Sequence, residues 1–364
     1  MKRNFQLLLV SYIMVFSAYS QNRITPALNI GSAAPALKVR EWIKDNPIQD
    51  FERGKIYVVD FWATWCKPCL AAAPHLSALA GKYKGKVIFC DIDVKERKNT
   101  PTSKIKASVQ SMGDRMNFHV AIEDSNYMEK DWLDAFGEQD YGIPRTFVVN
   151  ATGKIAWIGH PAFGLDTVLE KIVNNNWDIK KALTKRNFDR HLEALDDSTM
   201  RKLNPYVHKP DSALIVIKSI INDEPELKYA PQLGYYTFLA LLKTNPQKAY
   251  EFGKKLIVTT TYTEPAYEAI INGLKYSGNS NLPAEIYQLC AEARQEQINH
   301  YPYPEIVESI PSEYNEMAEW YWRANDKPKA IEAEEKAIKL SKNYSNISES
   351  DLASFKHSLR RYKM

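Results

Sequence analysis

The sequence predicts two consecutive architectures, a three-layer α/β domain with a mixed sheet and then an all-helical domain. Up to about residue 177, short β-branched and aromatic runs alternate with helical stretches. That alternation, closed by a strand pair and a helix, indicates a central sheet with helices on both faces. Beyond residue 177 strand signals nearly vanish and helical ones dominate. With 364 residues the chain is long enough for two or three domains, and we place them at 21–177 and 178–364.

The elements of the α/β half follow from local patterns. The run KIYVVDFW at 55–62 is apolar on both faces, so we expect a strand that does not lie at a solvated edge. A helix should begin directly after it, at Pro68 or Cys69, and reach about residue 84. Further along the chain we expect strands at 87–94, 117–122, 146–150 and 154–158, and helices at 104–112, 127–136 and 165–174.

In the second half, helices are expected to begin where proline falls in a first turn, because its missing N–H costs nothing there. Such starts occur near Pro246, Pro265, Pro283 and Pro328. They recur at roughly 15- to 45-residue spacing, which suggests stacked helical hairpins. The threonine-rich segment 259–263 should interrupt the helices as a β-prone turn.

One stretch of the second half partly resembles a tetratricopeptide repeat. Large and small residues stand at that repeat's packing positions, namely Tyr314, Met317, Ala318, Tyr321, Ala330 and Ala337. Glu334, however, occupies a normally aromatic position, and Lys342 stands where proline is usual. Any amphipathic helix pair places alanine and aromatic residues on one face. A repeat array and an ordinary helical array therefore both remain open.

Composition and charge exclude several classes of protein. Hydrophobic residues make up 45% and charged residues 25% of the chain, which excludes a wholly disordered protein. The net charge is only +4, from 48 basic and 44 acidic residues. No basic stripe with interleaved aromatic residues is present. Nucleic-acid binding is therefore disfavoured.

Residues 1–20 have the layout of a secretory signal peptide. Lys2 and Arg3 precede an apolar run at 7–16, and small residues, Ala18 and Ser20, stand at the −3 and −1 positions of a cleavage after Ser20. The run is short for a bilayer span, and no cysteine near the cleavage site supports a lipid anchor. An uncleaved anchor and a buried helix are the alternatives. We expect a periplasmic protein, in a compartment where disulfides persist.

Four cysteines narrow the chemistry. Cys90 lies in a β-branched run and Cys290 in a helical segment, so both are expected to be small buried hydrophobic residues. Cys66 and Cys69 form a pair at short range, between a buried strand and a helix. The N–H groups and dipole of a helix N-terminus lower the pKa of a thiol there, and Lys67 adds positive charge. Cys66 would then attack a substrate disulfide, and Cys69 would resolve the mixed disulfide.

Two other chemistries fit the sequence poorly. A zinc site needs two more ligands, but there is no second Cys-x-x-Cys and no nearby pair of histidines at ligand spacing, so we predict no metal. A thiol peroxidase needs threonine or serine three residues before its reactive cysteine. Ala63 stands at that position.

Four segments, in the expected order, resemble the thioredoxin family. They are IGSAAP at 30–35, VVDFWATWCKPC at 58–69, YGIPRTF at 141–147 and a closing hairpin at 150–159. The similarity is strongest to exported reductases of the cytochrome c maturation type. It covers about 40% of the chain, residues 30–177, and implies a thioredoxin fold there. The helical half has no counterpart in simple thioredoxins.

The resemblance implies roles for particular residues. Cys66 and Cys69 would be the attacking and resolving cysteines, and their disulfide would serve in place of a cofactor. Pro144 would be a cis proline facing that disulfide, with the Ile143 backbone free to pair with an extended substrate. Asp60 would exchange protons with Cys69, since a carboxylate in this apolar run is costly to bury without a task. The residues expected around the substrate are Trp65, Lys67, Pro68 and Ile143.

The expected partners are proteins. An enzyme of this kind would act on protein disulfide or thiol clients and, if it is a reductase, would need a membrane electron donor. The helical half would restrict access or recruit a protein partner. Two alternatives stay open: a thiol oxidase or isomerase, and a binding protein whose thioredoxin-like half only presents the helical domain.

Overall fold

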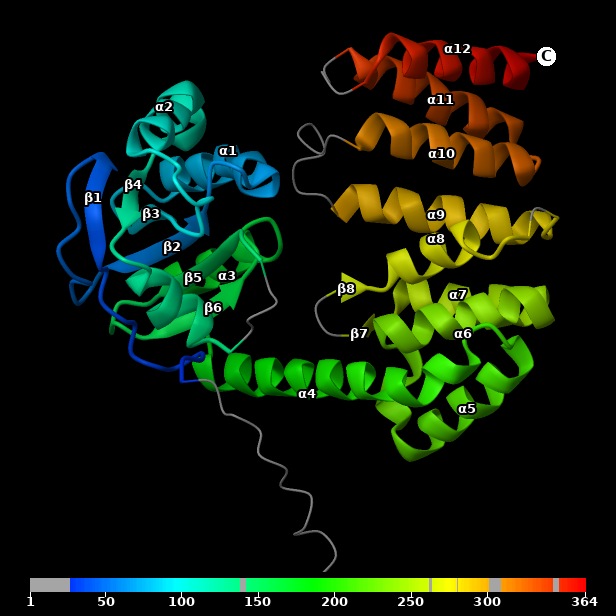
Figure 1. Ribbon diagram of the computed structural model, residues 1–364, viewed down its shortest axis with the longest axis horizontal. Helices are drawn as coiled ribbons and strands as arrows, with labels where there is room; N and C mark the ends of the chain where they lie inside the picture. Colours follow the sequence, from blue (N-terminus) through cyan, green and yellow to red (C-terminus); the bar gives the residue numbers. More distant parts are fainter. Residues whose placement is uncertain (1–26, 138–141, 262–263, 280, 301–308, 343–346) are drawn as a thin grey trace, which may run out of the picture.

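The computed structural model describes residues 27–137, 142–261, 264–279, 281–300, 309–342 and 347–364. Figure 1 shows a sheet with its covering helices beside a column of helices, with the long helix α4 running between them. Both predicted architectures are therefore present. The expected signal peptide, 1–20, and Tyr141 of the proline turn lie outside the described residues.

The sheet has six strands in the order β1-β4-β3-β2-β5-β6. Strand β2 is parallel to β3 and antiparallel to β5, so it lies inside the sheet, as its two apolar faces predicted. In this register Asp60 of β2 lies beside Asp91 of β3 and Thr146 of β5. The strands are β1 Val39–Lys44, β2 Ile56–Trp62, β3 Val87–Asp93, β4 His119–Glu123, β5 Arg145–Val149 and β6 Ile155–Gly159.

Alternate residues of the strands supply two separate cores, one on each face of the sheet. Val58, Trp62 and Val148 pack with helices α1 (Lys67–Lys82), α2 (Thr102–Met112) and α3 (Leu165–Val173), and with the short turn η1 (Gly113–Met116). Val59 and Phe61 pack on the other face, against the N-terminal segment, the turn η2 (Glu129–Asp134) and the start of α4. These faces give the three predicted layers.

Three local expectations differ from the structure. Strand β1 was not predicted, because only part of its sequence is apolar and it lies at the sheet edge. The helix expected at 127–136 includes a turn of π-helix, in which Ala135 N–H donates to the Lys130 carbonyl five residues earlier at 3.0 Å. This wide turn keeps Trp132 fully buried. The third difference is at Pro265, where the structure has a short strand and not the expected helix start.

Pro265 does not start a helix as expected. It ends the short strand β8 (Glu264–Pro265), which pairs with β7 (Thr260–Thr261) in the segment expected to be β-prone. Helix α8 begins two residues later, at Tyr267. The other three starts are confirmed, since α7 begins at Pro246, α9 directly after Pro283, and α11 one residue before Pro328.

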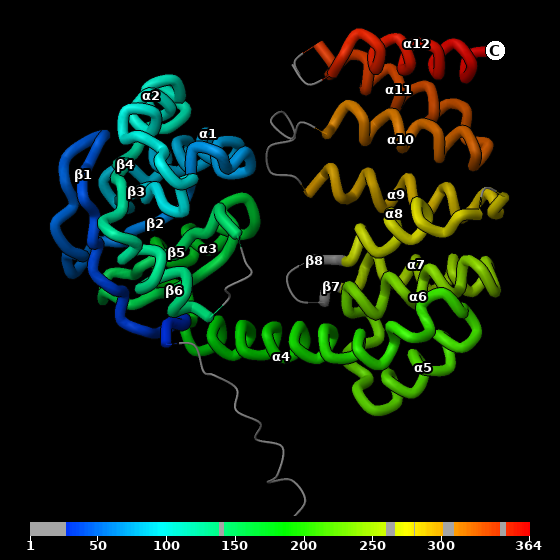
Figure 2. Tube along the Cα trace, in the orientation of Figure 1, coloured from blue at the N-terminus to red at the C-terminus, as the bar shows by residue number. Residues whose placement is uncertain are grey.

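The helices of the second half stack in chain order, as the tube in Figure 2 shows. The helical half has two hydrophobic cores, and helix α6 contributes to both. Leu233 and Ala240 pack with α4 and α5, whereas Phe238 and Leu242 pack with α7 to α12. The helices are α4 Ile179–Leu203, α5 Pro210–Asp223, α6 Pro231–Thr244, α7 Pro246–Val258, α8 Tyr267–Lys275, α9 Ala284–His300, α10 Ile310–Arg323, α11 Lys327–Ser341 and α12 Glu349–Lys363, with short turns η3 Asn204–Tyr206 and η4 Pro225–Tyr229.

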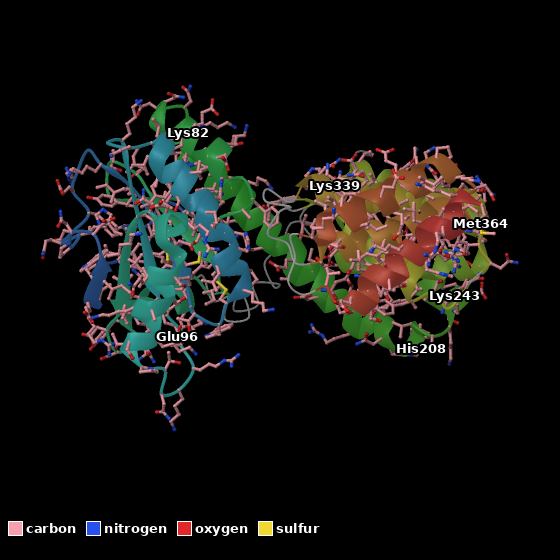
Figure 3. All side chains as sticks on the ribbon, turned by 90° about the horizontal axis from the view of Figure 1, so that it is seen from above. Lys82, Glu96, His208, Lys243, Lys339 and Met364 are labelled. Carbon is pink, nitrogen blue, oxygen red and sulfur yellow. A yellow bond between two sulfur atoms is a disulfide. The ribbon has the colours of Figure 1, made fainter. Side chains whose placement is uncertain are left out.

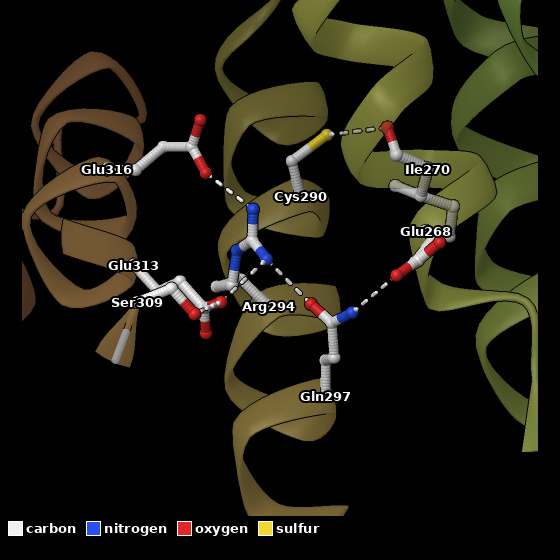
Figure 4. Close-up of polar contacts among 8 residues, drawn as sticks. All are labelled: Glu268, Ile270, Cys290, Arg294, Gln297, Ser309, Glu313 and Glu316. Atoms are coloured by element: carbon white, nitrogen blue, oxygen red, sulfur yellow. Dashed lines mark hydrogen bonds and ion pairs between the residues drawn. The ribbon is translucent and has the colours of Figure 1, made fainter. Parts of the chain in front are cut away.

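A buried arginine joins three of these helices (Figure 4). Arg294 of α9 donates to Glu316 of α10 at 2.6 Å and to Gln297 at 2.7 Å, and it lies 3.8 Å from Glu313. Gln297 in turn donates to Glu268 of α8 at 3.4 Å. Such a network fixes the helices in one register, because a buried charge left without its partner is costly.

Two further sequence predictions concern this half. Glu334 is fully buried in α11, and burial raises its pKa to about 8. Its position is thus a buried one, as the aromatic position of a tetratricopeptide repeat would be, but the tetratricopeptide interpretation itself stays a prediction. In the part of the chain described, no helix combines the length and apolar character that a bilayer span requires.

Candidate active site

Cys66 and Cys69 are joined by a disulfide where α1 begins. Cys66 is the residue that caps this helix: its Sγ accepts a hydrogen bond from the Cys69 N–H at 3.2 Å. Pro68 occupies the first turn, where it needs no N–H partner. When the disulfide is reduced, the free N–H groups and the helix dipole favour a thiolate at Cys66 over a thiol.

The two sulfur-bearing residues are almost covered. Cys66 is 2% exposed and Cys69 is 4% exposed, whereas Trp65 beside them is 42% exposed. Lys67 and Pro68 are exposed as well. Three of the residues expected around a substrate therefore form a rim next to the disulfide.

The proline turn contacts the disulfide from the opposite side. The Ile143–Pro144 peptide bond is cis. The Ile143 carbonyl oxygen lies 3.5 Å from Cys66 Sγ, and Pro144 itself is buried. The structure thus brings Ile143 and Pro144, 77 residues further along the chain, to the cysteine pair.

Asp60 is buried on the face of β2 that α1 covers. It alternates with Val58 and Trp62, which belong to the core beneath α1, and only 2% of it is exposed. The Thr146 hydroxyl donates a hydrogen bond to Asp60 Oδ1. Burial raises the pKa of Asp60 to about 8, although this hydrogen bond, the Phe61 N–H and the charge of Arg145 all act to lower it. The carboxyl therefore titrates in a range useful for proton transfer.

Sequence reasoning missed the other charged groups around Asp60. Asp91 of β3 lies next to it, and burial together with the charge of Asp60 raises the pKa of Asp91 well above its usual value. Arg145 directly follows the cis proline, and its charge joins burial in lowering the pKa of His160 to about 4. The signal available was an acidic residue inside each of two apolar strand runs, but their pairing becomes visible only in the folded sheet.

The remaining cysteines are confirmed as buried free thiols. Burial raises the pKa of both Cys90 and Cys290, which makes them poor nucleophiles. Among the described residues, no group of three or more His, Cys, Asp and Glu has the arrangement of a metal site.

Comparison with known proteins points to one family. Residues 42–113 match the family model for thioredoxin. FixW of Rhizobium leguminosarum is 34% identical over 200 residues, which are 53% of this chain and 86% of FixW. The thiol:disulfide interchange protein HelX of Rhodobacter capsulatus is 32% identical over 132 residues, 36% of this chain and 67% of HelX. A solved thioredoxin domain of a Bacteroides vulgatus thiol-disulfide oxidoreductase is 25% identical and covers 40% of this chain and 99% of its own, with a TM-score of 0.34.

A cysteine pair that closes to a disulfide at a helix N-terminus can exchange electrons with other disulfides, and HelX is named for thiol:disulfide interchange. The protein is accordingly a thiol–disulfide oxidoreductase. Because the similarity to FixW extends over most of that protein, the assignment does not depend on the short motif alone. The chain belongs to the thioredoxin family.

Proposed function

We propose that the protein is an exported reductase of protein disulfides, with Cys66 as the attacking and Cys69 as the resolving cysteine. The observation that carries the proposal is the contact between Cys66 Sγ, at the cap of α1, and the Ile143 carbonyl oxygen at 3.5 Å. An extended client segment that pairs with the Ile143 backbone would have its disulfide beside Cys66.

The reaction begins with both cysteines reduced. The Cys66 thiolate attacks one sulfur of the client disulfide, so a mixed disulfide forms and the other client sulfur leaves as a thiolate. The Cys69 thiolate then attacks Cys66 Sγ, which forms the Cys66–Cys69 disulfide and releases the second client sulfur. Two electrons pass to the client, and each released thiolate takes up a proton. A separate dithiol or membrane electron donor must reduce the enzyme again.

Asp60 serves the second step as a base. The attack by Cys69 needs a group that accepts its proton, and Asp60 lies buried on the face of the sheet that α1 covers. With a pKa of about 8, the carboxyl exchanges protons near the operating pH.

Export and partner recruitment complete the proposal. The basic and apolar residues at 1–20 support cleavage after Ser20 and a periplasmic location. The client is a protein, since Trp65, Lys67 and Pro68 form an exposed rim rather than a closed pocket. The helical half, held beside the sheet by α4 (Figure 1), restricts access to the disulfide or binds a protein partner.

The proposal is tested by trapping. Cys69→Ser removes the resolving thiol, so the purified variant should form mixed disulfides with clients from an oxidised periplasmic extract. These should appear as bands that dithiothreitol removes on a non-reducing gel. The matched control is Cys66→Ser, which lacks the attacking sulfur and should trap nothing under the same conditions. Equal trapping by both variants, or none by either, would contradict the assigned roles.

The direction of electron flow is read from the reduction potential of the Cys66–Cys69 pair against glutathione or dithiothreitol. A reductase should have a value of roughly −250 mV or lower, as thioredoxin does. A value near about −120 mV would assign the protein to thiol oxidation instead. A pair that never forms a disulfide in solution would support the binding-protein alternative.

A further inference from the structure

The segment that follows β3 holds the turn that carries Cys66. The Val94 N–H donates to the Trp62 carbonyl at 2.9 Å, and Trp65 Nε1 donates to the Lys95 carbonyl at 2.8 Å. The Thr64 N–H donates to Glu96 Oε1 at 2.5 Å. Three consecutive residues, 94–96, thus fix three of the four residues that precede Cys66 in the chain. Figure 3 shows Lys82, the last residue of α1, and Glu96 at opposite ends of the α/β half. Glu96 therefore lies toward the end of this half where α1 begins.

Glu96 also faces a second carboxyl group. Asp93, the last residue of β3, is 2% exposed, and the nearby Glu96 side chain acts on its carboxyl group to raise its pKa. Asp93 Oδ2 and Glu96 Oε2 are both buried acceptors to which no N–H or O–H group donates among the described residues. Two ionised carboxylates would repel each other here, whereas a single proton between them satisfies both oxygens.

The charges around the pair favour retention of that proton. Glu123 of β4 adds negative charge near Asp93 and so favours the proton, while Arg40 of β1 adds a smaller, opposing positive charge. Lys95 is 3.4 Å from Glu129 of η2, so its charge is already paired. Burial, followed by the charge and the hydrogen bond of Glu96, raises the pKa of Asp93 to about 8.

We propose that Asp93 and Glu96 share one proton and together position the turn from Thr64 to Cys66, so that loss of this proton releases the turn. Both are positioning residues, because neither touches the disulfide. Asp93 donates its proton to Glu96 Oε2, and Glu96 Oε1 accepts from the Thr64 N–H. When the proton leaves, repulsion between the carboxylates displaces Glu96 and weakens its hold on Thr64. Any effect on turnover rests on the proposed function, but the structural coupling does not.

The fluorescence of Trp65 can report whether loss of the shared proton changes the turn. Its indole is bonded to the Lys95 carbonyl next to Glu96, and it is partly exposed to water. The oxidised full-length protein is titrated from pH 6 to 9.5 by fluorescence, and the signal of Trp65→Phe is subtracted at each pH. In the disulfide form neither Cys66 nor Cys69 titrates. The difference should show one step with a midpoint near pH 8.

Variants decide which carboxyl causes the step. Asp93→Asn should abolish it, because an amide donates to Glu96 without titrating, and Glu96→Gln should abolish it as well. Asp60→Asn should leave the Trp65 step in place, since Asp60 is not bonded to this turn. A missing step in the unmodified protein, its persistence in Asp93→Asn, or its loss in Asp60→Asn would each overturn the proposal.

The two proposals fail separately. If Cys69→Ser traps no client while the step depends on Asp93, the disulfide-reductase function is wrong and the coupling stands. If clients are trapped but the step is independent of Asp93, the function stands and the coupling is wrong.

Discussion

At the scale of single residues, the chemistry of the site depends on how strongly a buried carboxyl holds its proton. Asp60 lies between two opposing influences, since burial disfavours its charge while Arg145 and the Thr146 hydroxyl favour it. Arg145 directly follows the cis proline, so the same turn that contacts Cys66 through the Ile143 carbonyl also places this cation. The base strength of Asp60 is therefore coupled to the proline turn beside the disulfide.

The pairing of Asp60 with Arg145 predicts how the rate of turnover depends on pH. Asp60→Asn should slow turnover on the order of 10²-fold, because proton transfer from Cys69 loses its acceptor. In the unmodified enzyme the rate should rise with pH through about 8, where Asp60 ionises, and the variant should lack this limb. Arg145→Met removes a charge that lowers the pKa of Asp60, so the midpoint should move to higher pH. Stopped-flow measurement of Cys69 resolution between pH 6 and 10 tests both variants.

The control for Arg145 is another half-buried cation. Arg186→Met removes the guanidinium that stacks 4.3 Å from the Phe136 ring but does not act on Asp60. Its midpoint should equal that of the unmodified enzyme. A parallel shift in both arginine variants would show that Arg145 does not set the pKa of Asp60.

Asp60→Asn should also be at least as stable to unfolding as the parent above pH 8, since Asp60 holds its proton more tightly in the folded protein than in the unfolded chain.

The same residues show which parts of the site can be predicted from the sequence. Cys66 and Cys69 were found because their chemistry is encoded in neighbouring positions, and Pro144 because a short motif resembles a known turn. Asp91 and Thr146 were missed because their closeness to Asp60 arises from strand pairing across 31 and 86 residues of chain. Glu96 was missed for the same reason, since its contact with Thr64 joins the segments that follow the paired strands β2 and β3, 32 residues apart in the chain.

At the scale of elements, strongly patterned segments were predicted and weakly patterned ones were not. The buried strand β2 and helix α1 have clear signals at both ends. Strand β1 has no fully buried residue, being half-buried except for the exposed Arg40, and it pairs with β4 through an irregular register, so no alternation marks it. Pro265 fitted a helix start locally, but pairing of 264–265 with 260–261 decided its structure. Local rules fail where tertiary pairing competes with them.

Two glycines allow helices α6, α7 and α8 to pack closely, which gives a prediction for stability. A Cβ at Gly273 of α8 would lie 2.5 Å from Phe238 Cδ1, and one at Gly253 of α7 would lie 2.5 Å from Leu289 Cδ2. Phe238 is fully buried and cannot move aside. Gly273→Ala should therefore destabilise the protein by about 1–3 kcal/mol through overpacking, despite the better helix propensity of alanine. Urea unfolding followed by circular dichroism measures this.

Gly81→Ala is the matched control for that prediction. Gly81 lies in helix α1, and no atom stands within 4 Å of a Cβ added there. Only the helix propensity changes, so this variant should gain roughly 0.5–1 kcal/mol. If Gly273→Ala were also stabilising, close approach of Phe238 would not limit residue 273.

At the scale of the whole molecule, one helix belongs to both halves. The first turns of α4 pack on the sheet: Ile179, Ala182 and Leu183 join the core of Phe61 and Phe147. Beyond them, Arg186 stacks on the Phe136 ring. Its second half joins the helical core through Leu192 and Leu203. A 25-residue helix is about 37 Å long, so a single rigid element sets the distance between the disulfide half and the helical column (Figure 1).

Sharing α4 predicts where the α/β half can be separated. A fragment of residues 21–190 keeps the turns of α4 that cover the sheet, whereas 21–177, the boundary expected from sequence, loses Ile179, Ala182 and Leu183. Exposing their contact face should cost the shorter fragment about 2 kcal/mol, or roughly 4–8 °C in Tm. Thermal unfolding of both oxidised fragments measures the difference.

Within the longer fragment, Leu183→Ala should reproduce most of that loss, while Thr184→Ala on the exposed side of the same helix should not. Equal Tm values for the two fragments would mean that α4 is only a tether, free to move the helical column relative to the disulfide. A lower Tm for 21–177 would mean that the sheet itself fixes the direction of α4. In that case a client approaching Cys66 meets the helical half in one defined position, and a partner bound to the column is held in a fixed place relative to the redox centre.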